Sequence, residues 1–263
     1  MKISIEDMLE LSDVETLHPG GLELSRRIAE LIKFNLSMRV LDVSSGKGIF
    51  ACMYAKDYGC RVTGIDIKQQ FIDIAIKRAE KEGVADKVDF RLGDSRKLPF
   101  PDGYFDVAIN ECAVGLTAIN DPAKVLSEMV RVTKTGGKVV IHESIWLKEL
   151  PLEDKEKLSM QLGTAPYSVD EWKQMLINAG AMPEIVEDWS GIENVQKMRP
   201  GFKWNPKDPS DFLTAKEKLA LFTRIIMKYG LLSLFEINRI RKNMTNISKD
   251  GYLGYVLIIG SKR

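Results

Sequence analysis

The strongest constraint on the fold is the stretch from residue 40 to residue 50. Residues 40–43 form a short apolar and β-branched run, which is typical of a buried parallel strand. The small residues 44–46 follow, and a helix-compatible run then extends over 47–58, where Gly59 predicts the helix end. Small residues let a ligand approach the backbone, and the free N–H groups of the first helical turn face that ligand. The stretch therefore predicts a nucleotide site between a strand and a helix.

Predicted strands and helices alternate along the chain that follows. β-Branched and apolar runs predict the strands, and apolar residues at helical spacing predict the helices between them. The predicted strands lie at residues 39–43, 61–66, 87–92, 106–110 and 138–142. The predicted helices lie at residues 22–34, 47–58 and 69–82, with another that begins at 121–122. This alternation predicts an α/β fold with a doubly wound parallel sheet.

Composition and charge exclude several classes of protein. The 263 residues are 44% hydrophobic and 29% charged, which suits one large globular domain or one domain with a sizeable insertion. A formal net charge of +1 gives no global field that would favour nucleic acid. Three cysteines without a secretory signal predict a reducing environment, and no apolar run approaches the roughly 20 residues that cross a bilayer. We therefore expect a cytoplasmic protein, monomeric or homodimeric, that engages no membrane.

Two motifs point to one family. The first turn lacks both the dinucleotide pattern G-x-G-x-x-G and the phosphate-loop pattern G-x-x-x-x-G-K-[ST]. Asp42, Ser44, Gly46 and Gly48 instead resemble the first motif of class I S-adenosylmethionine-dependent methyltransferases, D/E-x-G-x-G-x-G, with Ser44 in place of the first glycine. Residues 98–106 resemble the L-P-F-x-D-x-x-F-D signature of the same superfamily. The resemblance implies a methyltransferase whose cofactor is S-adenosylmethionine (SAM).

The predicted cofactor site extends over the ends of several strands. Asp66 ends the second strand, where a carboxylate accepts hydrogen bonds from ribose hydroxyls; a helix N-cap is the alternative role, and one carboxylate can serve both. The resemblance assigns Asp94 and Ser95 to the adenine. It also likens residues 20–23 to a segment of phosphoethanolamine methyltransferases that lies over the methionine end of the cofactor. The full predicted set is Gly21, Asp42, Ser44, Gly46, Gly48, Asp66, Ile67, Asp94, Ser95, Asn110 and Glu111.

Two residues are the catalytic candidates. Methyl transfer from a sulfonium is an in-line displacement, and a base is needed only if the nucleophile arrives protonated. His142, at the end of the fifth strand, is the candidate base, and a hydrogen-bonded structural histidine fits that position nearly as well. Glu111 is the second candidate and could bind an ammonium group. Glu143 and His18 occupy further plausible positions, and one cysteine near the site, Cys112, predicts no metal.

The resemblance also sets the domain organisation. It implies a seven-stranded Rossmann-like sheet, with a helix at 168–179, a sixth strand at 183–188 and an antiparallel last strand at 252–259. We predict N-terminal helices over 1–37, a SAM-binding core over 38–189 plus 251–263, and a helical lid or substrate cap inserted over 190–250. A long insertion at the strand ends favours a small enclosed acceptor.

Competing interpretations remain open at the level of sequence. Residues 224–249 carry six basic residues and one acid, which indicates a solvated helix face or, alternatively, a site for RNA or another polyanion. A non-catalytic SAM-binding module is a second alternative, because Ser44 departs from the glycine motif. A nicotinamide oxidoreductase fits less well, since G-x-G-x-x-G is missing. The leading prediction is a methyltransferase that acts on a small molecule and does not engage nucleic acid.

Overall fold

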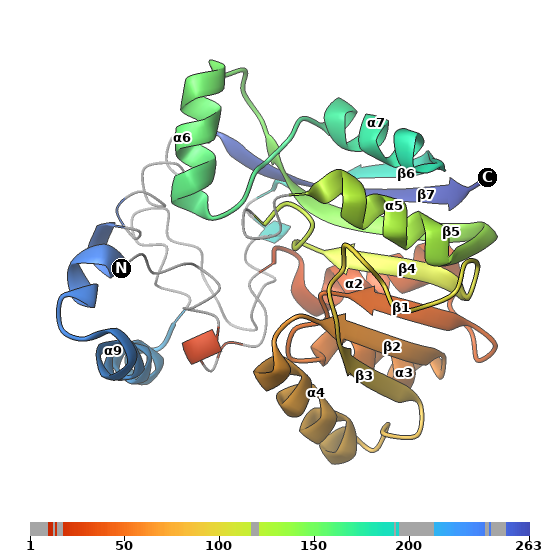
Figure 1. The fold of residues 1–263 in the computed structure, drawn as a ribbon, viewed down its shortest axis with the longest axis horizontal. Coiled ribbons are helices and arrows are strands. Elements are labelled where there is room, and N and C mark those ends of the chain that lie inside the picture. The colour runs from red at the N-terminus through yellow and green to blue at the C-terminus, as the bar shows by residue number, and fades with distance from the viewer. Residues whose placement is uncertain are drawn as a thin grey trace.

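A seven-stranded sheet forms the centre of the computed structural model, in the order β3-β2-β1-β4-β5-β7-β6 (Figure 1). The structure describes residues 10–12, 14, 18–116, 121–191, 193–194, 213–239, 242 and 251–263. The strands are β1 (Arg39–Val43), β2 (Arg61–Asp66), β3 (Val88–Leu92), β4 (Phe105–Glu111), β5 (Thr133–Trp146), β6 (Ala181–Asp188) and β7 (Leu253–Lys262). β1 to β5 pair in parallel, whereas β7 is antiparallel to both β5 and β6. The predicted doubly wound, seven-stranded α/β fold is confirmed.

Helices cover both faces of this sheet. The described helices are α2 (Gly21–Ile32), α3 (Ile49–Tyr58), α4 (Gln69–Glu82), α5 (Pro122–Val132), α6 (Leu152–Leu162), α7 (Val169–Ala179) and α9 (Ala215–Tyr229). α2, α3 and α4 pack on one face and α5 and α7 on the other (Figure 1). Val40 and Leu41 of β1 belong to these two opposite core clusters, because successive side chains of a strand point to opposite faces. The sheet is therefore buried on both sides where β1 runs.

Most element boundaries follow the sequence pattern, but β5 does not. The run predicted for 138–142 continues to Trp146, and the strand pairs with β7 from Lys138 to Trp146. The prediction ends early because polar residues follow His142, yet Glu143 and Ser144 are buried here. At the other end, β5 begins at Thr133 rather than at 138, and Gly136, whose φ is 76°, lies where the pairing of β5 with β4 is irregular.

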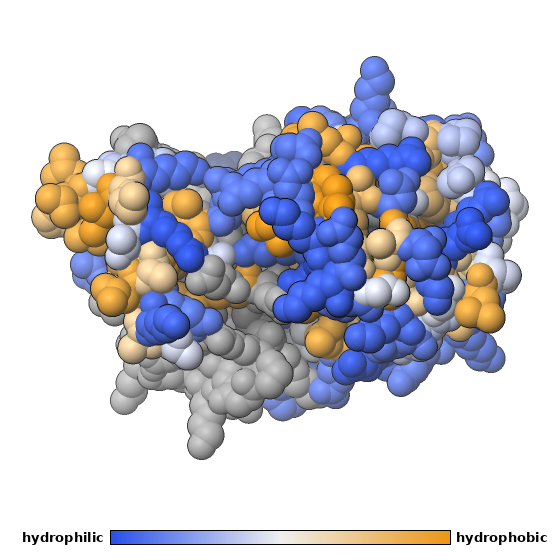
Figure 2. Space-filling model, turned by 90° about the horizontal axis from the view of Figure 1, so that it is seen from below, coloured by the Kyte–Doolittle hydropathy of each residue, from blue (hydrophilic) through white to orange (hydrophobic). Residues whose placement is uncertain are grey.

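α6, α9 and residues 10–12 lie beyond the carboxyl ends of the parallel strands (Figure 1). Residues 233–239 form a further helical stretch after α9, and an apolar cluster joins both to Val14. Apolar residues also gather on the surface at this end of the molecule (Figure 2), where Met227, Leu231, Leu232 and Phe235 are exposed. No described helix is long and apolar enough to span a bilayer. Residues 1–9 of the predicted N-terminal helices and much of the predicted lid lie outside the described residues, so those parts stay predictions.

Candidate active site

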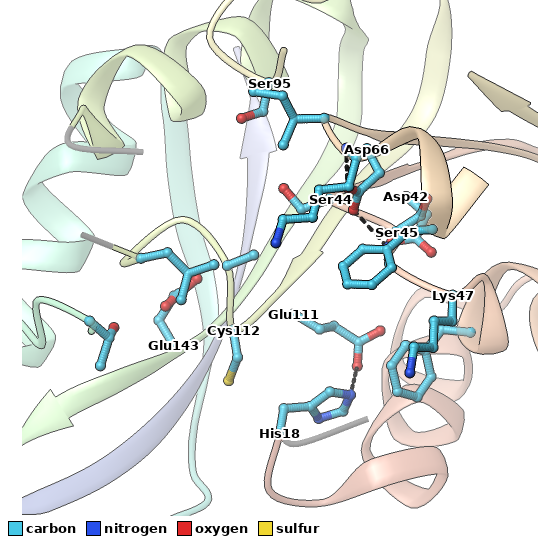
Figure 3. Close-up of a pocket in the computed structure, with 18 of the residues that line it drawn as sticks. His18, Asp42, Ser44, Ser45, Lys47, Asp66, Ser95, Glu111, Cys112 and Glu143 are labelled. Atoms are coloured by element: carbon cyan, nitrogen blue, oxygen red, sulfur yellow. Dashed lines mark hydrogen bonds and ion pairs between the residues drawn. The ribbon is translucent and has the colours of Figure 1, made fainter. Parts of the chain in front are cut away.

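A cavity of about 470 Å³ lies at the carboxyl ends of the parallel strands (Figure 3). The turns after β1, β2, β3 and β4 contribute to its lining, together with residues of β5, β7 and α6. β1 lies between β2 and β4, so the strand order reverses here. Open α/β sheets place ligands at such a switch point. The fold therefore positions the cavity where the sequence predicts the cofactor.

The turn after β1 is left-handed at three positions. φ is 61° at Ser44, 52° at Gly46 and 74° at Gly48. Ser44 and Gly46 line the cavity, and a Cβ added at Gly46 would meet no atom within 4 Å. A Cβ at Gly48 would instead lie 2.7 Å from both Ala75 and Phe90. Gly46 leaves room on the ligand side of the turn, whereas Gly48 lets α4 and β3 pack beneath it.

Asp66 joins the end of β2 to this turn. Its Oδ2 accepts the Gly46 N–H at 2.9 Å, and its Oδ1 accepts the Lys68 N–H at 2.9 Å. Burial raises the pKa of the Asp66 carboxyl, and these backbone donors oppose the rise. Asp66 thus holds both turns in place while it lines the cavity.

Asp42 lies in β1, just before the same turn, and is buried. Burial, with the nearby Asp66 charge, raises the pKa of its carboxyl to about 7. Asp42 Oδ2 and Ser45 Oγ are buried with no hydrogen-bond partner among the described residues. Buried polar atoms are normally satisfied, so these two atoms indicate a place for donors from a ligand.

The turn after β3 forms another edge of the cavity. Asp94 accepts hydrogen bonds from the Arg96 guanidinium at 2.7–3.1 Å, and this contact lowers the pKa of the Asp94 carboxyl. Ser95 is buried, whereas Ile67 is 63% exposed at the cavity edge. The predicted cofactor residues Ile67, Asp94 and Ser95 thus all line the cavity.

Glu111 is held by groups from three other segments. The Ser25 hydroxyl donates to Oε2 at 2.8 Å, the Tyr54 hydroxyl donates to Oε1 at 3.1 Å, and His18 Nε2 lies 3.6 Å from Oε2 (Figure 3). Burial, together with the charge of Asp42, raises the pKa of Glu111 to about 8. Burial lowers the pKa of His18 to about 4, so the imidazole is neutral at pH 7.

His142 lies behind the cavity wall and does not line it. Its Nδ1 is 3.2 Å from Cys112 Sγ, and its ring stacks on Tyr255 with centroids 5.8 Å apart. Burial holds its pKa well below the usual range. These contacts fit the structural role left open for His142, while its role as a base stays a prediction.

Glu143, the next residue of β5, does line the cavity. It is 1% exposed, and its Oε1 accepts the Val114 N–H at 2.8 Å. Burial raises the pKa of the Glu143 carboxyl to about 7, against the effect of the backbone N–H groups of 113–115. In Figure 3 it lies well apart from Asp42 and Asp66. The cavity therefore carries a second ionisable region.

Three predicted residues support the lining from outside it. Asn110 donates from Nδ2 to the Val43 carbonyl at 2.7 Å and accepts the N–H groups of Ala113 and Val114 through Oδ1. Gly48 packs beneath the turn, and Gly21 begins α2 with a φ of 47°. None of the three lines the cavity.

Sequence reasoning missed Ser25, Tyr54 and Tyr255. Tyr54 occupies an apolar helical position, and its hydroxyl gives no periodic signal of its partner. Ser25 lies within a helix whose buried stripe is otherwise apolar or small, and Tyr255 within an apolar strand. Only the three-dimensional packing brings these side chains to the site.

Comparison with known proteins points to methyltransferases. A family model described as a methyltransferase domain matches residues 41–141. The chain is 28% identical over 251 residues to 27-O-demethylrifamycin SV methyltransferase of Amycolatopsis mediterranei, covering 94% of this chain and 85% of that protein. It is 29% identical to phosphoethanolamine N-methyltransferase 1 of Zea mays, of which it spans only 38%. A SAM-dependent methyltransferase from Thiobacillus denitrificans, solved with S-adenosylhomocysteine (SAH), matches over both full lengths with a TM-score of 0.70 at 20% identity, which shows a shared fold.

Three observations now agree. The strand order places the left-handed turn after β1 at the switch point, Asp42, Ser44 and Gly46 of the predicted first motif line the cavity there, and the matched domain extends from β1 into β5. The chain therefore belongs to the class I S-adenosylmethionine-dependent methyltransferase superfamily.

Proposed function

We propose that this protein transfers a methyl group from SAM to a small-molecule acceptor bound in the same cavity. The observation that carries the proposal is that one cavity, of about 470 Å³, joins the turns of β1 to β3 to a second wall. A volume of this size is ordinary for a small-molecule site. We call the second wall the acceptor wall, and it consists of Leu116, Glu143, Ser144, Leu162, Thr164, Leu253 and Tyr255.

The residues around the β1 turn fit SAM. Asp66 retains free lone pairs toward the cavity after accepting its two backbone donors, as a ribose contact requires. The unpartnered Asp42 Oδ2 and Ser45 Oγ provide buried acceptors for further donors. When bound, SAM supplies a methyl group on a positively charged sulfur. That charge would favour the ionised forms of the buried Asp42 and Glu111 carboxyls, which attract it in return and whose pKa values burial raises to about 7 and about 8.

The main contribution of the protein to catalysis is to position SAM and the acceptor. The methyl group carries its own leaving group, so catalysis always requires the acceptor to be aligned with it. Chemical activation is needed only for an acceptor that arrives protonated. The cofactor turns are rigidly cross-linked through Asp66, and the acceptor wall is anchored by the pairing of β5 with β7. Both partners would thus be held on fixed elements.

The polyanion alternative finds no support in the described basic residues. Lys228 donates to Glu10, and Arg239 pairs with Glu236 within its own helical stretch. These contacts fit the solvated-face interpretation. The cytoplasmic location and the monomeric or homodimeric state stay predictions from the sequence.

Calorimetry of SAM and SAH binding tests the proposal, on wild type, on Asp66→Ala and on Asp73→Ala as an exposed control on α4. We expect micromolar binding that Asp66→Ala loses and Asp73→Ala retains. Transfer of labelled methyl from SAM to a panel of small molecules tests the reaction itself. A wild type that binds neither compound would contradict the cofactor site. Binding without transfer across a broad panel would favour a non-catalytic module.

A further inference from the structure

The acceptor wall has an unusual combination of apolar surface and one buried carboxylate. Its leucines and Tyr255 give it an apolar lining, and Ser144 and Thr164 lie within reach of each other at 3.4 Å between their hydroxyl oxygens. Glu143 is the one carboxyl group among the wall residues. An acceptor that fits this wall has an apolar body and one polar group placed against Glu143.

No cation of the described lining compensates Glu143. The basic side chains that line the cavity have partners other than Glu143: Lys47 donates to the carbonyls of Ser12 and Val14, Lys68 pairs with Glu10, and Arg96 pairs with Asp94. The remaining one, His18, is neutral at pH 7 because burial lowers its pKa to about 4. The titratable groups that face Glu143 are Cys112 and Tyr255, and burial raises the pKa of both, so both are uncharged near neutral pH. Among the described residues, backbone N–H groups alone stabilise a negative charge on Glu143.

A buried carboxylate without a cationic partner is costly, and a ligand that brings a positive charge removes that cost. We propose, on the basis of the methyl-transfer function above, that the acceptor is a protonated amine on an otherwise apolar molecule, and that Glu143 binds its ammonium group and accepts its proton.

The proton transfer is matched to an amine. An ammonium group has a pKa of about 10, roughly three units above that of Glu143, whereas an alcohol is a far weaker acid than an ammonium group. Transfer from the ammonium is thus unfavourable by about a thousandfold, which a catalytic step tolerates, and transfer from an alcohol is unfavourable by many more orders of magnitude. A phenol would match in acidity, but a neutral phenol would leave the buried charge of Glu143 uncompensated.

The step balances in atoms and charge. The ammonium proton moves to a carboxylate oxygen of Glu143, which leaves a neutral amine and a neutral carboxyl group. The nitrogen lone pair then forms the N–C bond as the C–S bond to the methyl breaks, and that electron pair stays on sulfur. The methylated amine carries the positive charge, and Glu143 returns its proton to solvent when the product leaves.

Matched ligands test this proposal on the full chain loaded with SAH. The panel consists of 4-phenylbutylamine, 4-phenylbutanol and 4-phenylbutanoate, together with the corresponding sets built on shorter phenylalkyl and on linear alkyl chains. Affinities are measured by calorimetry on wild type, Glu143→Gln, Glu143→Asp and Glu184→Gln, an exposed control on β6. In at least one set, we expect the amine to bind roughly 10- to 100-fold more tightly than its alcohol, the range for a hydrogen bond to a charged group.

The variants separate this proposal from the proposed function. Glu143→Gln should lose the amine preference while its SAH affinity stays within about twofold of wild type, because Glu143 lies apart from the cofactor turn. Glu143→Asp keeps the negative charge and should keep the amine preference. It serves as the second variant in case Glu143→Gln does not fold. A wild type that binds SAH but favours amines in no set, or a preference that survives in Glu143→Gln, overturns the proposal. Failure to bind SAH in wild type is instead the failure of the proposed function.

Discussion

Replacing Gly48 by alanine tests how the cofactor turn is packed, and Gly46→Ala is its matched control. Both glycines have positive φ, at 74° and 52°. Only at Gly48 does an added Cβ meet protein, at 2.7 Å from Ala75 Cβ and Phe90 Cζ and at 3.1 Å from Ala75 Cα. The two variants therefore share the backbone strain and differ in the steric clash.

The expected loss of stability follows from three contributions. A left-handed conformation costs a residue with a Cβ about 1–2 kcal/mol, and the loss of glycine entropy in the unfolded chain returns about 0.4–1 kcal/mol. Overpacking adds about 1–3 kcal/mol at Gly48 alone, because Phe90 can turn but the backbone of α4 at Ala75 must shift. We expect Gly48→Ala to lower the free energy of unfolding by about 2–4 kcal/mol and Gly46→Ala by about 1 kcal/mol or less.

Urea unfolding followed by circular dichroism measures the loss of stability in each variant. Calorimetry measures how tightly each variant binds SAH. Gly46→Ala should weaken SAH binding while it unfolds near the wild-type urea concentration, because its methyl group occupies open space on the cavity side of the turn. Gly48→Ala should unfold at a clearly lower concentration. Equal losses of stability in the two variants would refute the packing argument.

Three further predictions concern the same region. Ser44→Gly should raise the free energy of unfolding by about 0.5–1 kcal/mol in chemical denaturation, because it relieves a left-handed serine at φ 61°; an unchanged midpoint would contradict this. Folding raises the pKa of Asp42 to about 7 and of Glu111 to about 8, whereas His18 and His142 are neutral in both states above pH about 7, so in that range the folded cofactor-free protein binds more protons than the unfolded chain and stability falls as pH rises from 7 to 9. Thermal unfolding at pH 7 and 9 should show this fall, and Glu111→Gln should reduce it. Arg131→Met should cost about 2–3 kcal/mol, since Arg131 holds the turn before β4 through the Phe100 carbonyl and neighbouring acceptors, and hydrogen exchange should locate the loosening in that turn.

Local pattern was sufficient where an element carries its own signal. β1, β2 and α4 have the predicted boundaries, because apolar runs and helical spacing define each of them without reference to the rest of the chain. The doubly wound parallel sheet followed from the alternation of elements, and its seven strands with an antiparallel last strand followed from the resemblance. The positions of Asp42, Ser44, Gly46 and Asp66 at the cavity followed in turn, since they lie at the ends of those strands.

Pattern was insufficient where a polar side chain is buried by partners distant in sequence. Glu111 gave the same signal as an exposed strand end, yet Ser25, Tyr54 and His18 surround it. Glu143 marked an apparent end to β5, because its backbone N–H partners belong to the turn after β4. A polar residue that interrupts an apolar run is therefore ambiguous until the neighbouring strands are placed.

The glycine motif shows the same limit from the opposite direction. The pattern reports only that three positions of the turn need a left-handed backbone, and Ser44, Gly46 and Gly48 all have it. What a Cβ meets at each position depends on α4 and β3, which the motif does not contain. Ser44 lines the cavity, so its side chain has room, and the same substitution at Gly48 would strike Ala75. A side chain at the first glycine position of the motif, residue 44, is therefore compatible with a working turn, whereas one at the third, residue 48, would disrupt it. Ser44 thus gives little support to the interpretation of a non-catalytic module.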